Sequence, residues 1–290
     1  MNPQLYTLEG STINKIDQAN KHEAIEALES GKIIYLPNYS FIPQDNEKVL
    51  LSESVLDTKR KNISYNYSKH TLAGVTKQNA FAPLIQQLTH RYAMFSQNLV
   101  HTLLPQYKDH LIWGRTSYRP AQIDGRVTSK RKDDTRIHVD AFPSTPVNGL
   151  RIFRLFCNIN PYGEPRVWHV GESFSQVLNT FSKQLPRYSN TRANLLHFIK
   201  ATKTKRSAYD HYMLHMHDTM KLNDHYQETL TKQRIDFPAH STWLVFTDHV
   251  SHAALSGQFL LEQTFYLPVD AMVAPEKSPL KQWEGTGLLA

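Results

Sequence analysis

Residues 241–269 read STWLVFTDHVSHAALSGQFLLEQTFYLPV, three short apolar runs with turns between them. The runs are rich in Val, Leu, Phe and Tyr, which favour strands, and the Asp, Ser and Gly between them favour turns. Comparable runs lie upstream at 111–120 (LIWGRTSYRP), 135–143 (TRIHVDAFP), 150–161 (LRIFRLFCNINP) and 165–172 (PRVWHVGE). Many short strands broken by Pro, Gly, Asn and Ser predict an antiparallel barrel or sandwich.

Helical patterns surround these strands. Residues 18–31 carry apolar residues at helical spacing and end in Gly31, and residues 80–104 predict a long helix packed on a sheet. The run KIIYLPNYSF at 32–41 reads as a strand. We expect one domain over 1–290, with N-terminal support (1–105), barrel strands (106–173 and 233–270), a helical insertion (174–232) and a tail (271–290).

The composition is that of a soluble globular protein, with 40% hydrophobic residues over 290 positions. The single cysteine, Cys157, excludes an internal disulfide and fits a reducing compartment. We expect a cytoplasmic protein, because the first residues do not resemble a signal peptide and no apolar run is long enough to span a membrane. The net charge of +7 favours anionic partners, and basic residues gather at 129–136 and 200–206.

The stretch RIHVDAFP (136–143) contains two candidate metal-ligating residues. Side chains at i and i+2 of a strand point to the same side, so His138 and Asp140 converge. With a second histidine they would form the facial triad of non-haem Fe(II) oxygenases, which leaves positions open for a cosubstrate and O₂. This short motif alone also fits a surface ion pair. A structural zinc site is disfavoured, since it usually takes four ligands and mostly thiolates.

Two histidines compete for the third position. His249 lies in the turn after the WLVF run, whereas His252 opens the next strand, HAAL. We prefer His252, because the pattern of 2-oxoglutarate oxygenases places the distal histidine after an apolar strand and a short turn. His249 stays open as the alternative.

A carboxylate clamp for 2-oxoglutarate should be cationic and forked. Many oxygenases of this superfamily place an arginine 10 or 11 residues after the distal histidine, but here the nearest match is Gln263, which carries no charge. Alternation in the run 150–161 places Arg154 and Asn158 on one face, where polar residues inside a barrel need partners. We therefore predict that Arg154, Asn158 and Gln263 contact the cosubstrate.

Longer strings resemble one family. RKDDTRIHVDAFPSTP (131–146), AYDHYMLHMHD (208–218), KNISYNYSKHTLAG (61–74) and the segment 246–269 are similar to the Kdo hydroxylase family. The resemblance implies an α+β fold with a mainly β core: a double-stranded β-helix, of jelly-roll or cupin type, flanked by helices. It also implies a dioxygenase that uses Fe(II), 2-oxoglutarate and O₂ and hydroxylates 3-deoxy-D-manno-octulosonic acid (Kdo) at carbon 3, giving Ko. The family's iron ligands correspond to His138, Asp140 and His252.

The implied partner is a lipopolysaccharide precursor, Kdo-containing lipid A, whose carboxylates and phosphates suit a basic protein. We expect substrate contacts from the basic residues beside the metal strand, Lys130, Arg131, Lys132 and Arg136. The same charge favours peripheral contact with the anionic cytoplasmic face of the inner membrane. Two alternatives remain: an oxygenase of this fold acting on another acidic small molecule or a protein side chain, and a non-catalytic cupin-like binding protein. No motif for single-stranded nucleic acid is evident, and the sequence predicts no oligomeric state.

Overall fold

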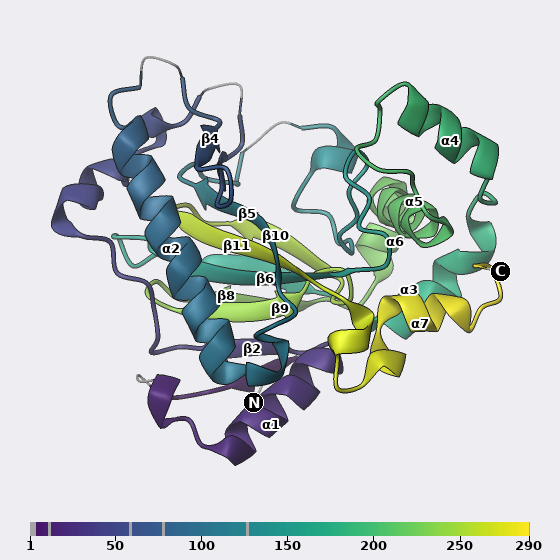
Figure 1. Ribbon diagram of the computed structural model, residues 1–290, viewed down its shortest axis with the longest axis horizontal. Helices are drawn as coiled ribbons and strands as arrows, with labels where there is room; N and C mark the ends of the chain where they lie inside the picture. Colours follow the sequence, from purple (N-terminus) through teal and green to yellow (C-terminus); the bar gives the residue numbers. More distant parts are fainter. Residues whose placement is uncertain (1–3, 11–12, 58–59, 77–78, 126–127, 290) are drawn as a thin grey trace.

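The computed structural model describes residues 4–10, 13–57, 60–76, 79–125 and 128–289. The strands within these residues form a sheet of eight and a sheet of three (Figure 1). Their orders are β1-β2-β9-β6-β11-β5-β3-β4 and β10-β7-β8. The strands are β1 (Leu5–Thr7), β2 (Ile33–Leu36), β3 (Ile63–Asn66), β4 (Thr71–Ala73), β5 (Ile112–Arg119), β6 (Arg151–Asn158), β7 (Arg166–Val170), β8 (Gln233–Phe237), β9 (Thr242–Phe246), β10 (His252–Ser256) and β11 (Leu260–Leu267).

The small sheet has a fourth member that is not a regular strand. His138 forms an isolated antiparallel bridge with His252, which places the segment 137–140 beside β10. Four segments therefore face the four central strands of the large sheet, β9-β6-β11-β5, as in a jelly roll. This confirms the expected double-stranded β-helix.

Aromatic side chains fill the space between the two layers. Trp168 and Phe237 from the small sheet pack against Phe156 and Trp243 from the large sheet, and the Phe237 and Trp243 rings stack with centroids 4.0 Å apart. All four residues are buried, and Trp168 also stacks on the imidazole of His252. The packed aromatic layer therefore forms one wall beside the histidine.

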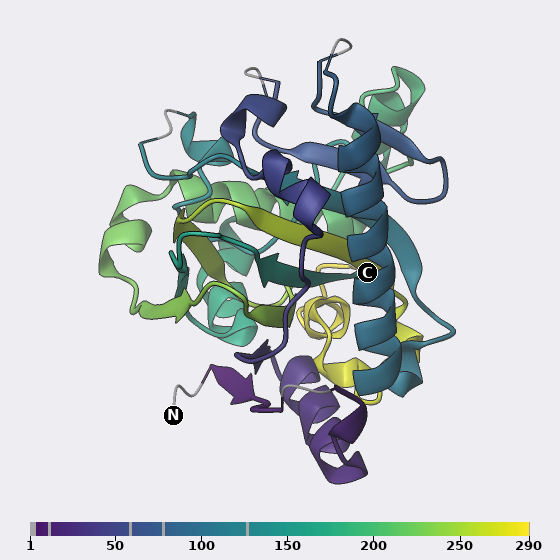
Figure 2. The ribbon, with the colours of Figure 1, turned by 90° about the vertical axis from the view of Figure 1, so that its left-hand side faces the viewer.

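The outer face of the large sheet is covered by α2 (Ala82–Leu103), the long helix expected from the sequence (Figures 1 and 2). Strands β6 and β11 alternate, so Leu155 and Leu261 belong to the core under α2 while Arg154 and Glu262 point into the barrel. The buried Tyr92 hydroxyl of α2 donates to the carbonyls of Leu155 and Leu261 at 3.1 and 3.2 Å. This contact ties the helix to the two strands that carry the barrel's charged residues.

The segment between β7 and β8 is helical, as expected, and contains α3 (Phe174–Phe181), α4 (Asn190–Phe198), α5 (Ala208–Leu222) and α6 (Asp224–Thr229). Ser173 and Ser207 begin α3 and α5 with capping boxes. The two helices share a core with the C-terminal α7 (Pro279–Glu284), whose Trp283 stacks on Tyr212. The tail is therefore packed onto the insertion.

The remaining elements are α1 (Gln18–Glu29) and eight short 3-10 helices: η1 (Ile13–Lys15), η2 (Asp45–Leu50), η3 (Glu53–Val55), η4 (Pro105–Tyr107), η5 (Lys130–Lys132), η6 (Ser182–Gln184), η7 (Val269–Ala271) and η8 (Pro275–Lys277). The N-terminal part does more than support the barrel, because β2 pairs with β9 and the β3–β4 hairpin pairs with β5. Among the described residues, no helix combines the length and apolar character that crossing a membrane requires.

Candidate metal centre

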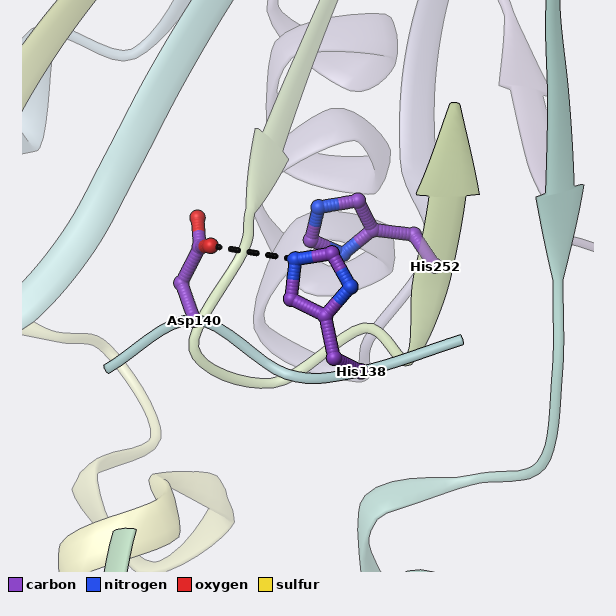
Figure 3. Close-up of side chains that lie close together, drawn as sticks. All are labelled: His138, Asp140 and His252. Atoms are coloured by element: carbon purple, nitrogen blue, oxygen red, sulfur yellow. Dashed lines mark ion pairs between the residues drawn. The ribbon is translucent and has the colours of Figure 1, made fainter. Parts of the chain in front are cut away.

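Three side chains from two distant parts of the chain converge inside the barrel. One ligand atom from each of His138, Asp140 and His252 lies within 4.8 Å of the others, and all three residues are buried. The Nε2 atom of His138 lies 3.6 Å from Oδ1 of Asp140, and the two imidazole centroids are 4.8 Å apart (Figure 3). Within the described residues, this is the one such group of three His, Cys, Asp or Glu side chains.

Hydrogen bonds orient both imidazoles in the same way. Nδ1 of His138 lies 2.8 Å from the carbonyl of Arg136, and Nδ1 of His252 lies 2.8 Å from the carbonyl of Val250. A carbonyl only accepts, so each Nδ1 carries the proton and each Nε2 keeps its lone pair. This tautomer is the one that a metal ligand requires when its second ring nitrogen is held by the protein.

The ionisation states also suit a metal. Burial lowers the pKa of His138 to about 3, and burial also lowers the pKa of His252. Burial by itself would raise the pKa of Asp140, but the guanidinium of Arg154 and the two neighbouring imidazoles outweigh it and hold this pKa well below its usual range. At neutral pH the group is therefore two neutral imidazoles and a carboxylate, the forms that bind metals.

Unsatisfied polar atoms mark the same cavity. Oδ2 of Asp140, Nε of Arg154 and Nε1 of Trp168 are buried without a hydrogen-bond partner among the described residues. All three residues line one pocket with the two histidines. Leaving a buried donor without a hydrogen bond costs about 1–3 kcal/mol, so two such donors indicate a site for an anion, and the Asp140 oxygen, held only by an ion pair with Arg154, is available to a cation.

Arginine is concentrated in this pocket. Nη1 of Arg154 lies 3.3 Å from Asp140 Oδ2 and 3.4 Å from Glu262 Oε1. Arg119 donates to Glu262 Oε2 through Nε and Nη2, at 3.0 and 2.7 Å, and Arg166 also lines the pocket. Arg119, Arg166 and Trp168 were not among the residues expected from the sequence. Their alternation with apolar neighbours in the runs 111–120 and 165–172 was the available signal.

The comparisons with known proteins agree with this geometry. The model of the 3-deoxy-D-manno-oct-2-ulosonic acid (Kdo) hydroxylase family matches residues 12–287. The chain belongs to this family. One similar solved structure is that of the Kdo hydroxylase KdoO, a non-haem Fe(II) α-ketoglutarate-dependent dioxygenase, in complex with cobalt(II). Its sequence is 45% identical to that of this chain, and the alignment covers 98% of this chain and 95% of KdoO with a TM-score of 0.94.

A second KdoO structure, in complex with α-ketoglutarate and Fe(III), is 44% identical with a TM-score of 0.93 and covers 97% and 95% of the two chains. A third, with succinate and Fe(III), is also 44% identical with a TM-score of 0.93, and covers 98% and 95%. A search of curated proteins found no match. The assignment of the chain to this family is therefore supported by a match over nearly its whole length and by these similar structures.

The structure brings His252, and not His249, to the His138–Asp140 pair. The ring of His249 packs edge-on against Phe174, with centroids 5.7 Å apart, beside the backbone of Gly31. Gly31 has a φ of +83°, and a Cβ there would lie 3.4 Å from the His249 ring. His249 therefore fills a buried space behind the barrel.

Two of the three cosubstrate contacts expected from the sequence do not reach the pocket. Asn158 shares a face with Arg154, but its amide donates to the carbonyls of Glu164 and Phe237 and holds a strand end. Gln263 points to the opposite face of β11, where it accepts from the Thr116 hydroxyl at 2.6 Å. Both assignments are corrected: alternation placed Gln263 outside the barrel, and backbone carbonyls occupy Asn158.

Three of the four basic residues beside the metal strand form ion pairs away from the pocket. Lys130 and Arg136 both form ion pairs of 2.6 Å with Asp224, and Arg131 pairs with Asp218 at 3.3 Å. The backbone carbonyl of Lys132 accepts from Lys61. None of these four residues lines the pocket or the adjoining cleft. The structure therefore places these four residues outside the pocket and the cleft, and three of them are paired with acidic residues of α5 and α6.

A larger cleft of about 600 Å³ opens beside the metal pocket. The two share Arg119, Arg154 and Glu262 as lining residues, so the cleft leads to the metal centre. Three basic residues that enter no ion pair within the described residues line its wall: Lys69, Arg115 and Lys203. The aromatic side chains of Trp113, Phe142 and Tyr266 complete a wall that is both cationic and aromatic.

Proposed function

We propose that this protein is an Fe(II)- and 2-oxoglutarate-dependent dioxygenase that hydroxylates the Kdo sugar of the lipopolysaccharide inner core or lipid A at carbon 3, giving Ko. The observation that carries the proposal is the buried group of His138, Asp140 and His252, in which each imidazole is held through its Nδ1 atom and all three side chains line one pocket. It lies in a chain of the Kdo hydroxylase family.

The residues present fit both a metal and a cosubstrate. We assign Nε2 of His138, a carboxylate oxygen of Asp140 and Nε2 of His252 as the atoms that would hold iron, and three protein ligands would leave positions open for 2-oxoglutarate and O₂. Bound iron, with 2-oxoglutarate and O₂, supplies the oxidising power that converts a C–H bond to C–OH and releases succinate and CO₂.

The charges of the pocket support a dianionic cosubstrate. Its lining contains three arginines and three carboxylates, which balance one another. A divalent metal would add two positive charges, and the two carboxylates of 2-oxoglutarate would neutralise them. We assign Arg154 and Trp168, whose Nε and Nε1 atoms have no hydrogen-bond partner among the described residues, as donors to a cosubstrate carboxylate, with Arg119 beside them.

The protein's own contribution is orientation and exclusion of water. Arg154 holds Asp140 ionised and positioned through their 3.3 Å contact. The backbone carbonyls at 136 and 250 fix the imidazole rings. The rings of Phe156 and Trp168 close the inner end of the pocket, which protects a reactive centre from bulk water.

The substrate would enter through the cationic cleft. Kdo carries a carboxylate and lipid A carries phosphates, so Lys69, Arg115 and Lys203 replace the four residues named from the sequence as candidate anion contacts. The aromatic faces of Trp113 and Tyr266 offer apolar surfaces against which a sugar ring can lie. We further propose that the enzyme works in the cytoplasm, at the inner face of the inner membrane, where this precursor is anchored.

The direct test is turnover. Purified protein with Fe(II), ascorbate, 2-oxoglutarate and Kdo-bearing lipid A should form succinate and a product about 16 mass units heavier, the gain of one oxygen atom. Succinate formation driven by another acidic small molecule or a peptide, and not by Kdo-lipid A, would contradict the substrate assignment. A protein that binds the sugar equally well after His138→Ala, and never forms succinate, would be the non-catalytic alternative.

A further inference from the structure

The outward face of α4 is apolar. Leu195, Phe198 and Ile199 follow the i, i+3, i+4 spacing that places side chains on one side of a helix. Their exposed fractions are 58%, 84% and 59%, which makes Phe198 the most exposed large hydrophobic residue in the described part of the chain. Ala193, on the inner side, is buried. A helix that directs its larger apolar residues outward is built to meet another surface.

Basic residues surround this apolar face. The segment 183–206 contains no Asp or Glu, and its cations are Lys183, Arg187, Arg192, Lys200, Lys203, Lys205 and Arg206. No ion pair within the described residues involves Lys200, Lys203 or Lys205. The other basic cluster, at 130–136, differs because Asp218 and Asp224 neutralise it. The positive charge around α4 therefore remains available to an external anion.

The same segment borders the cleft that leads to the metal centre. Lys203 lines the cleft, its amide donates to the carbonyl of Ser144 at 3.0 Å, and Arg206 donates to the carbonyl of Pro143 at 2.7 Å. Ser144 and Pro143 line the cleft as well. In Figure 1, α4 projects from the upper edge of the molecule, the same edge as β4. A surface that α4 touches would thus lie beside residues that line the cleft.

We propose that α4 is a membrane-docking element: Leu195, Phe198 and Ile199 enter the acyl boundary of an anionic bilayer while the surrounding lysines and arginines contact its headgroups. An exposed apolar face within a basic collar is the chemistry of interfacial membrane helices. The occupant follows from this charge and from the cleft beside it, since the proposed substrate is itself an anionic lipid. The inference extends the proposed function by stating how the enzyme reaches that substrate.

The test compares full-length variants in vesicle co-sedimentation. Phe198→Ser/Ile199→Ser removes the apolar contact, and Lys200→Gln/Lys205→Gln removes charge without altering the cleft. Ile42→Ser is the matched control, because Ile42 is 63% exposed and its carbonyl accepts from Arg91 of α2, a helix that Figure 1 shows on the opposite side of the sheet from α4. Phosphatidylglycerol and phosphatidylcholine vesicles without any substrate serve as probes.

We expect the wild type and Ile42→Ser to bind phosphatidylglycerol vesicles and not phosphatidylcholine vesicles. Each double variant should bind the anionic vesicles at least about tenfold more weakly, and 0.5 M salt should mimic the charge variant. Wild-type affinity in both double variants would overturn the proposal and assign the face to a protein partner or to packing. Equal loss in Ile42→Ser, or equal binding to both lipids, would overturn it too.

Turnover provides a second readout. The double variants should hydroxylate a deacylated, water-soluble Kdo saccharide at the wild-type rate but lose turnover on the lipid embedded in vesicles. Loss on both substrates would contradict a docking role. Because vesicle binding requires no turnover, a protein that docks through α4 yet hydroxylates neither substrate would refute the proposed function and leave this inference standing.

Discussion

The backbones of His138 and His252 exchange two hydrogen bonds, of 3.0 and 2.8 Å, so two residues far apart in the sequence sit directly opposite each other. Each imidazole is held by the carbonyl two residues before it, through Nδ1. The backbone therefore places both Nε2 atoms before any metal arrives. A centre prepared in this way should respond to substitution locally, without loss of the fold.

The first prediction concerns the two histidines that the sequence left in competition. His252→Ala should lower Co(II) affinity by more than about 100-fold. Removing a residue that only hydrogen-bonds to a metal ligand already lowers metal affinity about 10–100-fold, and loss of the ligand itself should cost more. Isothermal titration with Co(II) measures this. The protein should stay folded, since the backbone bridge does not involve the imidazole.

His249→Ala is the matched control for this experiment. This variant should be less stable but should still bind Co(II) with wild-type affinity, because the His249 ring packs against Phe174 and does not line the metal pocket. Equal loss of Co(II) binding in both variants would mean that the centre depends on packing rather than on ligation by His252.

The second prediction concerns the cosubstrate. Arg154→Gln should raise the KM for 2-oxoglutarate by about 10–100-fold, because a charge-assisted hydrogen bond contributes about 1.5–3 kcal/mol. Steady-state kinetics at saturating iron measure this change, and Arg154→Lys should recover part of the affinity. Gln263→Met is the control: it breaks the Thr116 contact and should lower Tm without changing that KM. An unchanged KM in Arg154→Gln would exclude Arg154 from the clamp.

The third prediction separates the two sets of basic residues. The double change Lys69→Gln/Arg115→Gln should raise the KM for Kdo-lipid A about tenfold or more and leave the KM for 2-oxoglutarate unchanged, because both residues line the outer cleft. Arg131→Gln should alter neither constant appreciably, since Arg131 is already paired with Asp218 at the surface. If Arg131→Gln raised the KM for Kdo-lipid A more than the double change did, the basic residues at 130–136 would contact the substrate, as first expected from the sequence.

The fourth prediction concerns pH. Burial, with a smaller contribution from Arg151, lowers the pKa of His249 from its ordinary 6.5 to about 3. Between these values the unfolded chain binds a proton that the folded chain does not, so stability falls as the pH drops below about 6.5. One such histidine contributes up to about 1.4 kcal/mol per pH unit.

Urea unfolding of the metal-free protein at pH 7 and pH 5 checks this sign. The free energy of unfolding of the wild type should fall between pH 7 and pH 5. For His249→Gln it should fall less, because this variant lacks the proton uptake of His249 on unfolding. If the variant followed the wild-type slope, His249 would be protonated, or accessible to solvent, in the folded protein.

Short-range patterns predicted the barrel strands, the long helix α2 and the insertion helices, because apolar alternation and helical spacing depend only on residues close together in the sequence. Other elements were harder to predict, and two of them show why. The strand β8 follows the insertion in a run with only Ile235 and Phe237 as apolar signals, and the segment around His138 makes a single bridge instead of a ladder. Pairing partners of such weak segments depend on strands that are remote in sequence.

The sequence by itself determined that many short strands form an antiparallel barrel or sandwich and that His138 and Asp140 point to one side, because strand alternation and side-chain direction are local properties of the backbone. Only the tertiary structure decided that His252 rather than His249 joins them, that Arg119, Arg166 and Trp168 line the same pocket, and that Asp218 and Asp224 pair with Lys130, Arg131 and Arg136. The partner of a long, charged or buried side chain is set by distant segments that folding brings within a few ångströms, and no spacing along the chain encodes that distance.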